Sequence, residues 1–327
     1  MTDEKKGPPK RTRRRPVVVA SPDDTAVSFK TVAVFGGSGF VGRNLIRRLT
    51  ESGVNVVVAS RHPASVDVDD VRRGNGTVKP VQASILSADS VRTAVDGVDA
   101  VINLVGILQE SGSQTFDAIH VDGARRVAEA SRDAGVGRLV HMSALGADAN
   151  ASSAYARSKA LGERRVCEVL PETTILRPSI IFGPEDDFFN RFAAMAKYAP
   201  ALPLIGGGDT RFQPVYVGDV TEAITRFLTD DTTKGKTYEL CGPKIYTFKD
   251  LLQLILKQKG MTRALIPIPF VVAEIQGTIL QMLPNAPLTR DQVESLKQDN
   301  VFSGTCPGFA DLKIAPTRVE DVIPTYL

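Results

Sequence analysis

The sequence predicts an α/β protein in which helices cover both faces of a doubly wound parallel sheet, with a smaller C-terminal lobe. A glycine-rich turn joins an apolar segment to a helical one at residues 31–49. Short apolar segments then alternate with helical ones as far as residue 176, a rhythm typical of parallel sheets. After Pro178 this rhythm changes. The 327 residues, 43% of them hydrophobic, are enough for one large domain or for a domain with a small lobe.

The glycine turn is the strongest motif. Residues 31–35 form a predicted buried strand, and Gly36-Gly-Ser-Gly-Phe-Val-Gly42 follows it. Gly36 permits a tight turn, Gly39 lacks the Cβ that would keep a pyrophosphate away, and Gly42 lets the next helix pack closely. That helix directs its first N–H groups and the positive end of its dipole at a phosphate. We therefore predict a Rossmann-type dinucleotide site here; the alternative is a tight turn without a ligand.

The remaining elements follow in order. Predicted strands cover residues 54–59, 78–82, 98–104, 139–142 and 173–176, and predicted helices cover 87–95, 115–134 and 154–170. Beyond residue 178 the pattern predicts helices over 187–198, 219–228 and 248–259 and strands over 214–217 and 237–240. Because the carboxyl ends of parallel strands meet at one edge of a sheet, we expect ligand-binding residues to gather there. The expected residues at that edge are Gly36, Arg61, Gly106 and Ser143.

We divide the chain into a tail, a nucleotide-binding domain and a lobe. Residues 1–28 form a basic tail that we expect to be disordered. The Rossmann domain covers residues 29–183 and is completed by about 213–243, while residues 184–212 and 244–327 form the smaller C-terminal lobe. Within residues 1–16, seven lysines and arginines stand against two acidic residues. The simpler interpretation is a solvated tail, and the alternative is contact with anionic lipid or an acidic partner.

Residues 264–283 are strongly apolar and carry one charge, on Glu274. Only 14 residues separate Pro269 from Pro284, whereas a membrane span needs about 20. We expect a buried helix of the lobe; the alternative is a helix that lies against a membrane surface or a hydrophobic partner. Residues 289–297 predict a capped helix with a polar face.

Charge and cysteine content exclude two classes of function. Outside residues 1–16 the chain is close to neutral, so we expect no nucleic-acid partner. The three cysteines and three histidines are scattered along the sequence, so we expect no metal site, and the cysteines fit a reducing compartment.

The end of the second predicted strand bears on the choice of cofactor. Ser60-Arg61-His62 stands where NAD-binding folds often place an acidic residue that holds the ribose 2′-hydroxyl. No carboxylate follows before Asp67, and an arginine suits a 2′-phosphate. We therefore expect NADP(H) in preference to NAD(H); the alternative is a surface arginine.

Tyr155 and Lys159 lie one helical turn apart, which puts both on one face of a predicted helix. A nearby ammonium would stabilise a tyrosinate and lower the pKa of Tyr155 toward the working pH. The tyrosine could then exchange a proton with a carbonyl or alcohol while a nicotinamide exchanges hydride. Lys159 could also hold the nicotinamide ribose, and Ser143 could orient the substrate oxygen.

With these motifs in this order, residues 31–260 resemble the extended short-chain dehydrogenases, which include NAD-dependent epimerases and dehydratases. Ser84 departs from the pattern, because many members carry an aspartate near the adenine at this place. The matching segments are residues 36–42, 103–106, 142–143, 155–159, 176–179, 182–183 and 215–219.

A closer resemblance, over nearly everything after residue 30, is to the dinucleotide-binding accessory subunits of respiratory complex I in their bacterial form. It rests on residues 175–183, 266–270, 287–293 and 299–301. The resemblance implies a tightly held structural NADP(H), other complex I subunits as partners, and a role in assembly or stability without independent turnover. It also implies a peripheral place on the cytoplasmic face of the bacterial inner membrane, near the junction of the peripheral and membrane arms.

The motifs and the resemblance together give one set of expected cofactor-binding residues. These are Gly36, Ser38, Gly39, Phe40, Val41, Gly42, Arg61, Leu104, Val105, Gly106, Ser143, Tyr155, Lys159 and Pro178.

Two other functions stay open. One is a free-standing NADP(H)-dependent dehydrogenase, reductase or sugar-nucleotide epimerase with Ser143, Tyr155 and Lys159 as catalytic residues. The other is a cofactor-sensing regulator. The subunit hypothesis is favoured by the resemblance at the C-terminal end, by the apolar residues 264–283 and by the basic tail. The intact Ser143, Tyr155 and Lys159 do not decide between the hypotheses, because Tyr155 and Lys159 would hold the nicotinamide ribose even when no substrate arrives.

Overall fold

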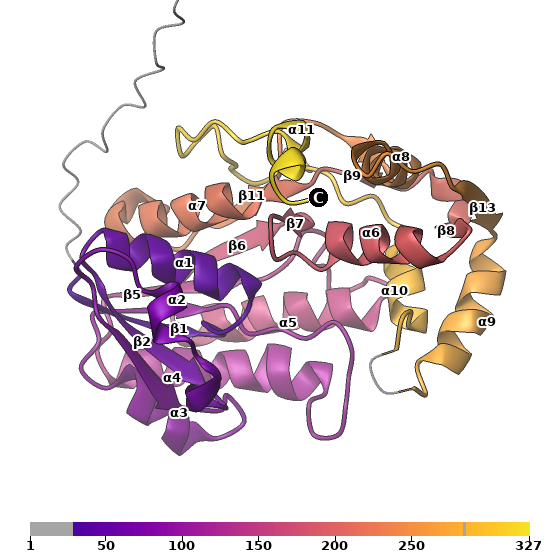
Figure 1. Cartoon of the computed structure of the whole chain (residues 1–327). Helices are drawn as coiled ribbons and strands as arrows, with labels where there is room; N and C mark the ends of the chain where they lie inside the picture. Colours follow the sequence, from indigo (N-terminus) through magenta and orange to yellow (C-terminus); the bar gives the residue numbers. More distant parts are fainter. Residues whose placement is uncertain (1–28, 284–285) are drawn as a thin grey trace, which may run out of the picture.

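The structure is a computed structural model that describes residues 29–283 and 286–327. The expected basic tail, residues 1–28, lies outside this range. At the centre of the described part is a seven-stranded parallel sheet with the order β11-β6-β5-β4-β1-β2-β3 (Figure 1). The predicted doubly wound fold is therefore confirmed. The strands are β1 Thr31–Phe35, β2 Asn55–Ser60, β3 Val78–Gln82, β4 Ala100–Asn103, β5 Arg138–Met142, β6 Thr174–Pro178 and β11 Thr237–Leu240.

Two hydrophobic cores cover the two faces of the sheet, because successive side chains of a strand point to opposite faces. Val32 and Val34 of β1 belong to one core, and Ala33 and Phe35 belong to the other. The first face is covered by α1 Phe40–Glu51, α2 Val68–Val71 and α7 Val217–Thr229. The second face is covered by α3 Ala88–Val95, the π-helix Asp117–Gly123, α4 Ala124–Asp133 and α5 Ala154–Val169 (Figure 1).

The C-terminal elements build a third core from aromatic and aliphatic side chains, including Phe182, Phe189, Phe248 and Leu252. Short strand pairs stand around it: β7 with β10, β9 with β12, and β8 with β13. These strands are β7 Ile181–Phe182, β8 Ala201–Ile205, β9 Arg211–Phe212, β10 Val215–Tyr216, β12 Tyr246–Thr247 and β13 Ala264–Ile268. The helices are α6 Phe188–Tyr198, α8 Phe248–Gln258, α9 Phe270–Leu280, α10 Arg290–Ser295 and α11 Val319–Val322.

The expectation of a buried helix over residues 264–283 is wrong. Residues 264–268 form β13, which pairs with β8 in parallel, and proline at 267 suits the edge of such a small sheet better than a helix interior. The helix that follows, α9, buries only Ala273 and Gly277. Its other side and the turn after it form what we call the α9 apolar face. This face consists of Val271, Val272, Ile275, Ile279, Met282 and Leu283, all exposed.

The predicted helix over residues 115–134 begins as a π-helix, Asp117–Gly123, before α4. Its wider turn lies directly against α5, since a Cβ on Gly162 would come within 2.1 Å of the His120 carbonyl oxygen. Hydrophobic spacing alone did not reveal this change of helix type, and π-helical turns are common at functional sites.

Candidate functional site

Three of the glycines in the turn, Gly36, Gly39 and Gly42, are required for different physical reasons. Gly36 has φ +79°, and a Cβ there would lie 3.1 Å from the carbonyl carbon of Leu104. A Cβ on Gly42 would lie 2.4 Å from the Gly36 oxygen, so close packing of α1 requires glycine. A Cβ on Gly39 would touch only the Gly36 oxygen, at 3.3 Å. The fold therefore demands glycine at 36 and 42, whereas position 39 faces open space of the kind that a ligand needs.

Helix α1 begins at this turn with its N–H groups free for an anion. Within the described residues no side chain caps the helix, and its first turn carries no acidic residue. The uncapped N–H groups and the helix dipole together favour a phosphate. Ser38 contributes through its backbone, because its carbonyl accepts a hydrogen bond from Nη1 of Arg43 at 2.6 Å.

A cleft of about 350 Å³ opens where the turn meets the ends of β4 and β5. This is where the strand order reverses direction around β1 and β4, the place at which open α/β sheets bind ligands. Ile107, Leu108 and Met142 were not predicted, although each stands next to or near a predicted residue. The lining residues are Gly36, Gly39, Phe40, Val41, Gly42, Leu104, Gly106, Ile107, Leu108, Met142, Ser143, Tyr155 and Lys159.

Four of the expected cofactor residues do not line this cleft, and one of them, Arg61, lines the second pocket described below. Ser38 supports the turn as described. Val105 packs partly into the core below the cleft, and its N–H donates to Oδ1 of Asn103 at 3.1 Å. Pro178 is buried at the end of β6, where its carbonyl accepts from the Leu145 N–H.

Ser143 lies just beyond β5 with only 3% of its surface exposed. Its backbone N–H donates to the Leu176 carbonyl at 2.7 Å, which fixes the residue at the sheet edge. Among the described residues its buried hydroxyl has no hydrogen-bond partner. A buried hydroxyl without a partner costs free energy, so the geometry is suited to a ligand oxygen at this point of the cleft.

Lys159 is 4% exposed, and its Nζ donates to the Met142 carbonyl at 2.8 Å. Burial lowers the pKa of Lys159 to about 8, while Glu163 partly opposes the shift. The ammonium form therefore still predominates at neutral pH, and it is tied to the strand end beside Ser143.

The expectation of a lowered tyrosine pKa is wrong. Burial of the Tyr155 phenol raises its pKa to about 12, because the tyrosinate loses more hydration than it gains from charge. The ring packs edge-on to His120 and Phe116, with ring centroids 5.5 and 6.0 Å away. At neutral pH Tyr155 is thus a hydrogen-bond donor and a proton source, not a base.

His120 was not predicted as a site residue, yet its ring packs against the Tyr155 ring. Its Nε2 must accept from the Ile107 N–H at 3.0 Å, because an amide can only donate. The proton is therefore on Nδ1, which donates to Oγ of Ser158 at 2.8 Å, and Ser158 donates to the Tyr155 carbonyl. Burial and the charge of Lys159 lower the pKa of His120 to about 3, so the ring stays neutral.

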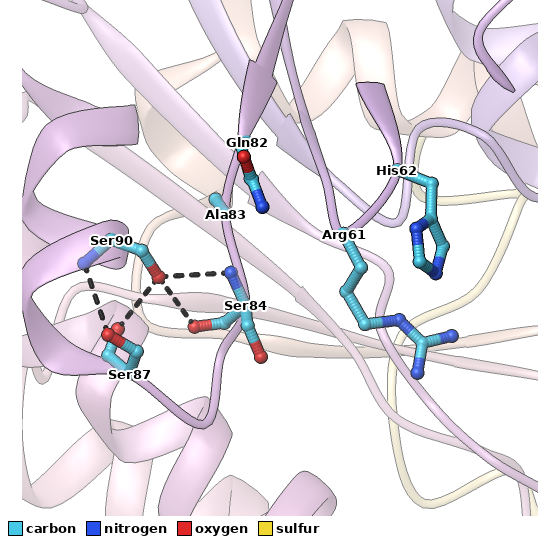
Figure 2. Close-up of a pocket in the computed structure, with 7 residues that line it drawn as sticks. All are labelled: Arg61, His62, Gln82, Ala83, Ser84, Ser87 and Ser90. Atoms are coloured by element: carbon cyan, nitrogen blue, oxygen red, sulfur yellow. Dashed lines mark hydrogen bonds between the residues drawn. The ribbon is translucent and has the colours of Figure 1, made fainter. Parts of the chain in front are cut away.

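A second pocket, of about 570 Å³, opens beside the ends of β2 and β3. Figure 2 shows the exposed Arg61 and His62 on one side and the serines at the start of α3 on the other. Oγ of Ser90 bonds to the backbone N–H and carbonyl of Ser84, both at 3.0 Å, which closes the turn that leads into α3. The lining residues are Arg61, His62, Gln82, Ala83, Ser84, Ser87 and Ser90, with no carboxylate among them.

Residues 29–283 and 286–327 contain no group of three histidine, cysteine, aspartate or glutamate side chains placed to hold a metal ion. Over the same residues, every helix is too short or too polar to cross a membrane.

Comparisons with known proteins agree with this geometry. The family model described as NAD dependent epimerase/dehydratase family matches residues 32–241. The chain is 36% identical to NADH dehydrogenase (ubiquinone) 1 alpha subcomplex subunit 9, mitochondrial, of Mus musculus, over 90% of this chain and 79% of the mouse protein. It is 29% identical to the NADH-ubiquinone oxidoreductase 40 kDa subunit, mitochondrial, of Neurospora crassa, over 96% of this chain and 83% of that protein.

A solved structure shares the fold. DesIV, a dTDP-glucose 4,6-dehydratase from Streptomyces venezuelae with NAD and TYD bound, has a TM-score of 0.67 and 20% sequence identity. The similarity covers 90% of this chain and 95% of that chain. The two resemblances inferred from the sequence, to the epimerases and dehydratases and to complex I subunits, are confirmed.

Proposed function

The chain belongs to the NAD dependent epimerase/dehydratase family, and from this premise we propose that it is an accessory subunit of respiratory NADH:quinone oxidoreductase (complex I). In this proposal it holds a nicotinamide dinucleotide as a structural element and supports the assembly or stability of the complex. The observation that carries the proposal is the similarity to two mitochondrial complex I subunits over at least 90% of the chain, well beyond the end of the family match at residue 241.

The first cleft supports the cofactor part of the proposal. The pyrophosphate would lie on the free N–H groups of α1 beside Gly39, and the nicotinamide ribose would lie near Tyr155 and Lys159. Ser143 would donate its free hydroxyl to the cofactor or to a ligand beside it. The bound nicotinamide would supply hydride chemistry, which a structural role leaves unused.

The second pocket supports NADP(H) in preference to NAD(H). Arg61 offers a guanidinium, and Ser84, Ser87 and Ser90 line the other side of the pocket with groups that do not repel a phosphate. Nη1 of Arg61 donates to Oε1 of Gln114 at 2.6 Å. A 2′-phosphate would displace the neutral Gln114 amide from Arg61, because a hydrogen bond between two charged groups is stronger than one to a neutral acceptor.

The cleft offers a residue that can hold the ribose of a cofactor. Lys159 binds the Met142 carbonyl, which positions it for a ribose as well as for catalysis.

The α9 apolar face supports docking to a hydrophobic surface. Glu274, the one charged residue of α9, is paired with Lys297 at 2.7 Å, so little charge opposes burial of this face. Contiguous exposed apolar surface is a mark of interaction sites. We propose that other complex I subunits cover it, at the cytoplasmic face of the bacterial inner membrane near the junction of the two arms. The membrane surface itself, reached through residues 264–283 and the basic tail, is the alternative contact.

Native separation of detergent-solubilised membranes tests the proposal. This chain and NADH:quinone activity are followed in the same fractions, and nucleotide is extracted from the peak. Comigration with bound NADP(H) is expected. A soluble protein that never comigrates with the activity would contradict the subunit role, and comigration without nucleotide would contradict the cofactor role.

A free-standing reductase or epimerase is the second candidate, because Ser143, Tyr155 and Lys159 line one cleft. It predicts measurable turnover that Tyr155→Phe lowers by about a hundredfold or more. Turnover that this variant leaves unchanged would exclude it.

A further inference from the structure

The helix that carries Tyr155 and Lys159 is capped by a residue from the far end of the chain. Asp291, near the start of α10, directs its carboxylate at the first turn of α5. Its Oδ1 accepts from the Ala154 N–H at 2.6 Å, and its Oδ2 accepts from the Tyr155 N–H at 3.1 Å. The cap thus bonds to the backbone of the cleft tyrosine itself.

Ser153 completes this cap. Its hydroxyl donates to Oδ2 of Asp291 at 2.9 Å and accepts from the Ala156 N–H at 3.3 Å. The hydroxyl of Ser295, also on α10, lies 3.0 Å from it. The first three N–H groups of α5, which have no partner inside the helix, are therefore all satisfied, and the carboxylate stabilises the positive end of the helix dipole. The position of this turn depends on α10.

Helix α10 is in turn fixed to α9. A Cβ on Gly277 would lie 2.8 Å from the Arg290 nitrogen, so α9 lies directly against the first turn of α10. Ala273 and Val293 are fully buried in the small core between the two helices. Because α9 and α10 are in direct contact, a displacement of α9 also moves α10 and Asp291. The α9 apolar face is on the outer side of the same helix.

We infer that Asp291 is a positioning residue that couples the nucleotide cleft to the α9 apolar face. The inference rests on the proposed cofactor and docking functions. A partner that covers α9 would hold Asp291 and the first turn of α5 in place, and a nucleotide against Tyr155 and Lys159 holds the same turn from the cleft side. Because coupling between two sites is reciprocal, nucleotide binding strengthens docking by the same factor as docking strengthens nucleotide binding.

Hydrogen–deuterium exchange on the full chain, nucleotide-free and saturated with NADPH, tests this coupling. In the wild type we expect slower exchange in the glycine turn, in α5 and also in residues 270–295. In Asp291→Ala the protection of residues 270–295 disappears, and NADPH binds about tenfold more weakly, within the roughly 5- to 150-fold range of known couplings. Asp291→Asn keeps the volume and one acceptor oxygen, so it gives an intermediate loss and serves if the alanine variant folds poorly.

Asp299→Ala is the matched control, because Asp299 lies in the same part of the chain and its carboxylate binds Arg211. It keeps both the remote protection and the affinity. Wild-type protein protected at the glycine turn but unchanged at residues 270–295 would overturn the coupling and leave the cofactor site intact, as would equal affinities of the Asp291→Ala and Asp299→Ala variants. Absence of NADPH-dependent protection everywhere would overturn the proposed cofactor site and the coupling with it.

Discussion

Changing Gly42 or Gly39 to alanine should have different effects, because the first change should lower the stability of the protein and the second should weaken nucleotide binding. In Gly42→Ala the new methyl group meets three backbone atoms: the Gly36 oxygen at 2.4 Å, the Gly37 Cα at 2.5 Å and the Gly37 carbonyl carbon at 2.7 Å. All three belong to the turn, so relief requires α1 to move away from the sheet. Overpacking of this kind costs about 1–3 kcal/mol, which should appear as lower stability with or without nucleotide.

In Gly39→Ala the methyl group meets only the Gly36 oxygen, at 3.3 Å. Position 39 has φ −79°, which alanine adopts freely, so the loss of stability should be about 1 kcal/mol or less, the size of a weakened helix cap. The methyl group would instead occupy space that the pyrophosphate needs, and nucleotide binding should fall by tenfold or more.

Urea unfolding and nucleotide titration of both variants separate these effects. We expect Gly42→Ala to lose stability and Gly39→Ala to lose affinity. The reasoning is refuted if Gly42→Ala is as stable as the wild type, or if Gly39→Ala binds NADPH with unchanged affinity.

Three further predictions concern single side chains. Arg61→Gln should weaken NADPH binding by about 10- to 150-fold, the equivalent of a charged hydrogen bond of about 1.5–3 kcal/mol, with NADH affinity unchanged; equal losses for both nucleotides in a titration would argue against a 2′-phosphate contact. Burial lowers the pKa of Lys159 from 10.5 to about 8, so between these values the unfolded chain binds a proton that the folded chain does not, and stability rises with pH by about 3 kcal/mol. Lys159→Met lacks this rise. Urea unfolding at pH 8 and 10.5 should therefore show that the free energy of unfolding increases more in the wild type than in the variant. The same difference in stability between the two proteins at both pH values would contradict the lowered pKa of Lys159. Ile275→Asp should abolish comigration with NADH:quinone activity, whereas Ile245→Asp, at an exposed residue outside α9, should not; comigration of both variants would disprove docking through α9.

The sequence predicts the parts of this protein that depend on local pattern. The apolar run of β1, the glycine turn and α1 determine one another within residues 31–51, so their structure could be predicted directly. The same holds for α10, whose Thr289 and Gln292 form a reciprocal cap visible in the sequence.

Features that depend on distant contacts could not be predicted. The pKa of Tyr155 is set by burial among side chains from other elements, which sequence spacing to Lys159 does not reveal. Residues 264–268 became a strand because β8 offers them a partner, and the prolines at 203 and 267 hide that pairing in the sequence. The apolar composition of α9 is the same for a buried or an exposed helix, and only the fold decides which it is.

The order of the central sheet has a consequence for synthesis of the chain. Strand β1 pairs with β2 and β4, and each later strand of this sheet, from β5 through β6 to β11, joins the outer edge of the preceding strand of the sheet. No strand has to enter between two that are already paired, so the sheet can grow as the chain leaves the ribosome. Until residue 240 has emerged, however, β6 is an edge strand whose backbone groups can pair with other chains. In the full chain β11 covers β6, and the Glu239 N–H of β11 donates to the Pro307 carbonyl. We therefore expect polypeptides that stop between β6 and β11 to be more prone to aggregation than the full chain.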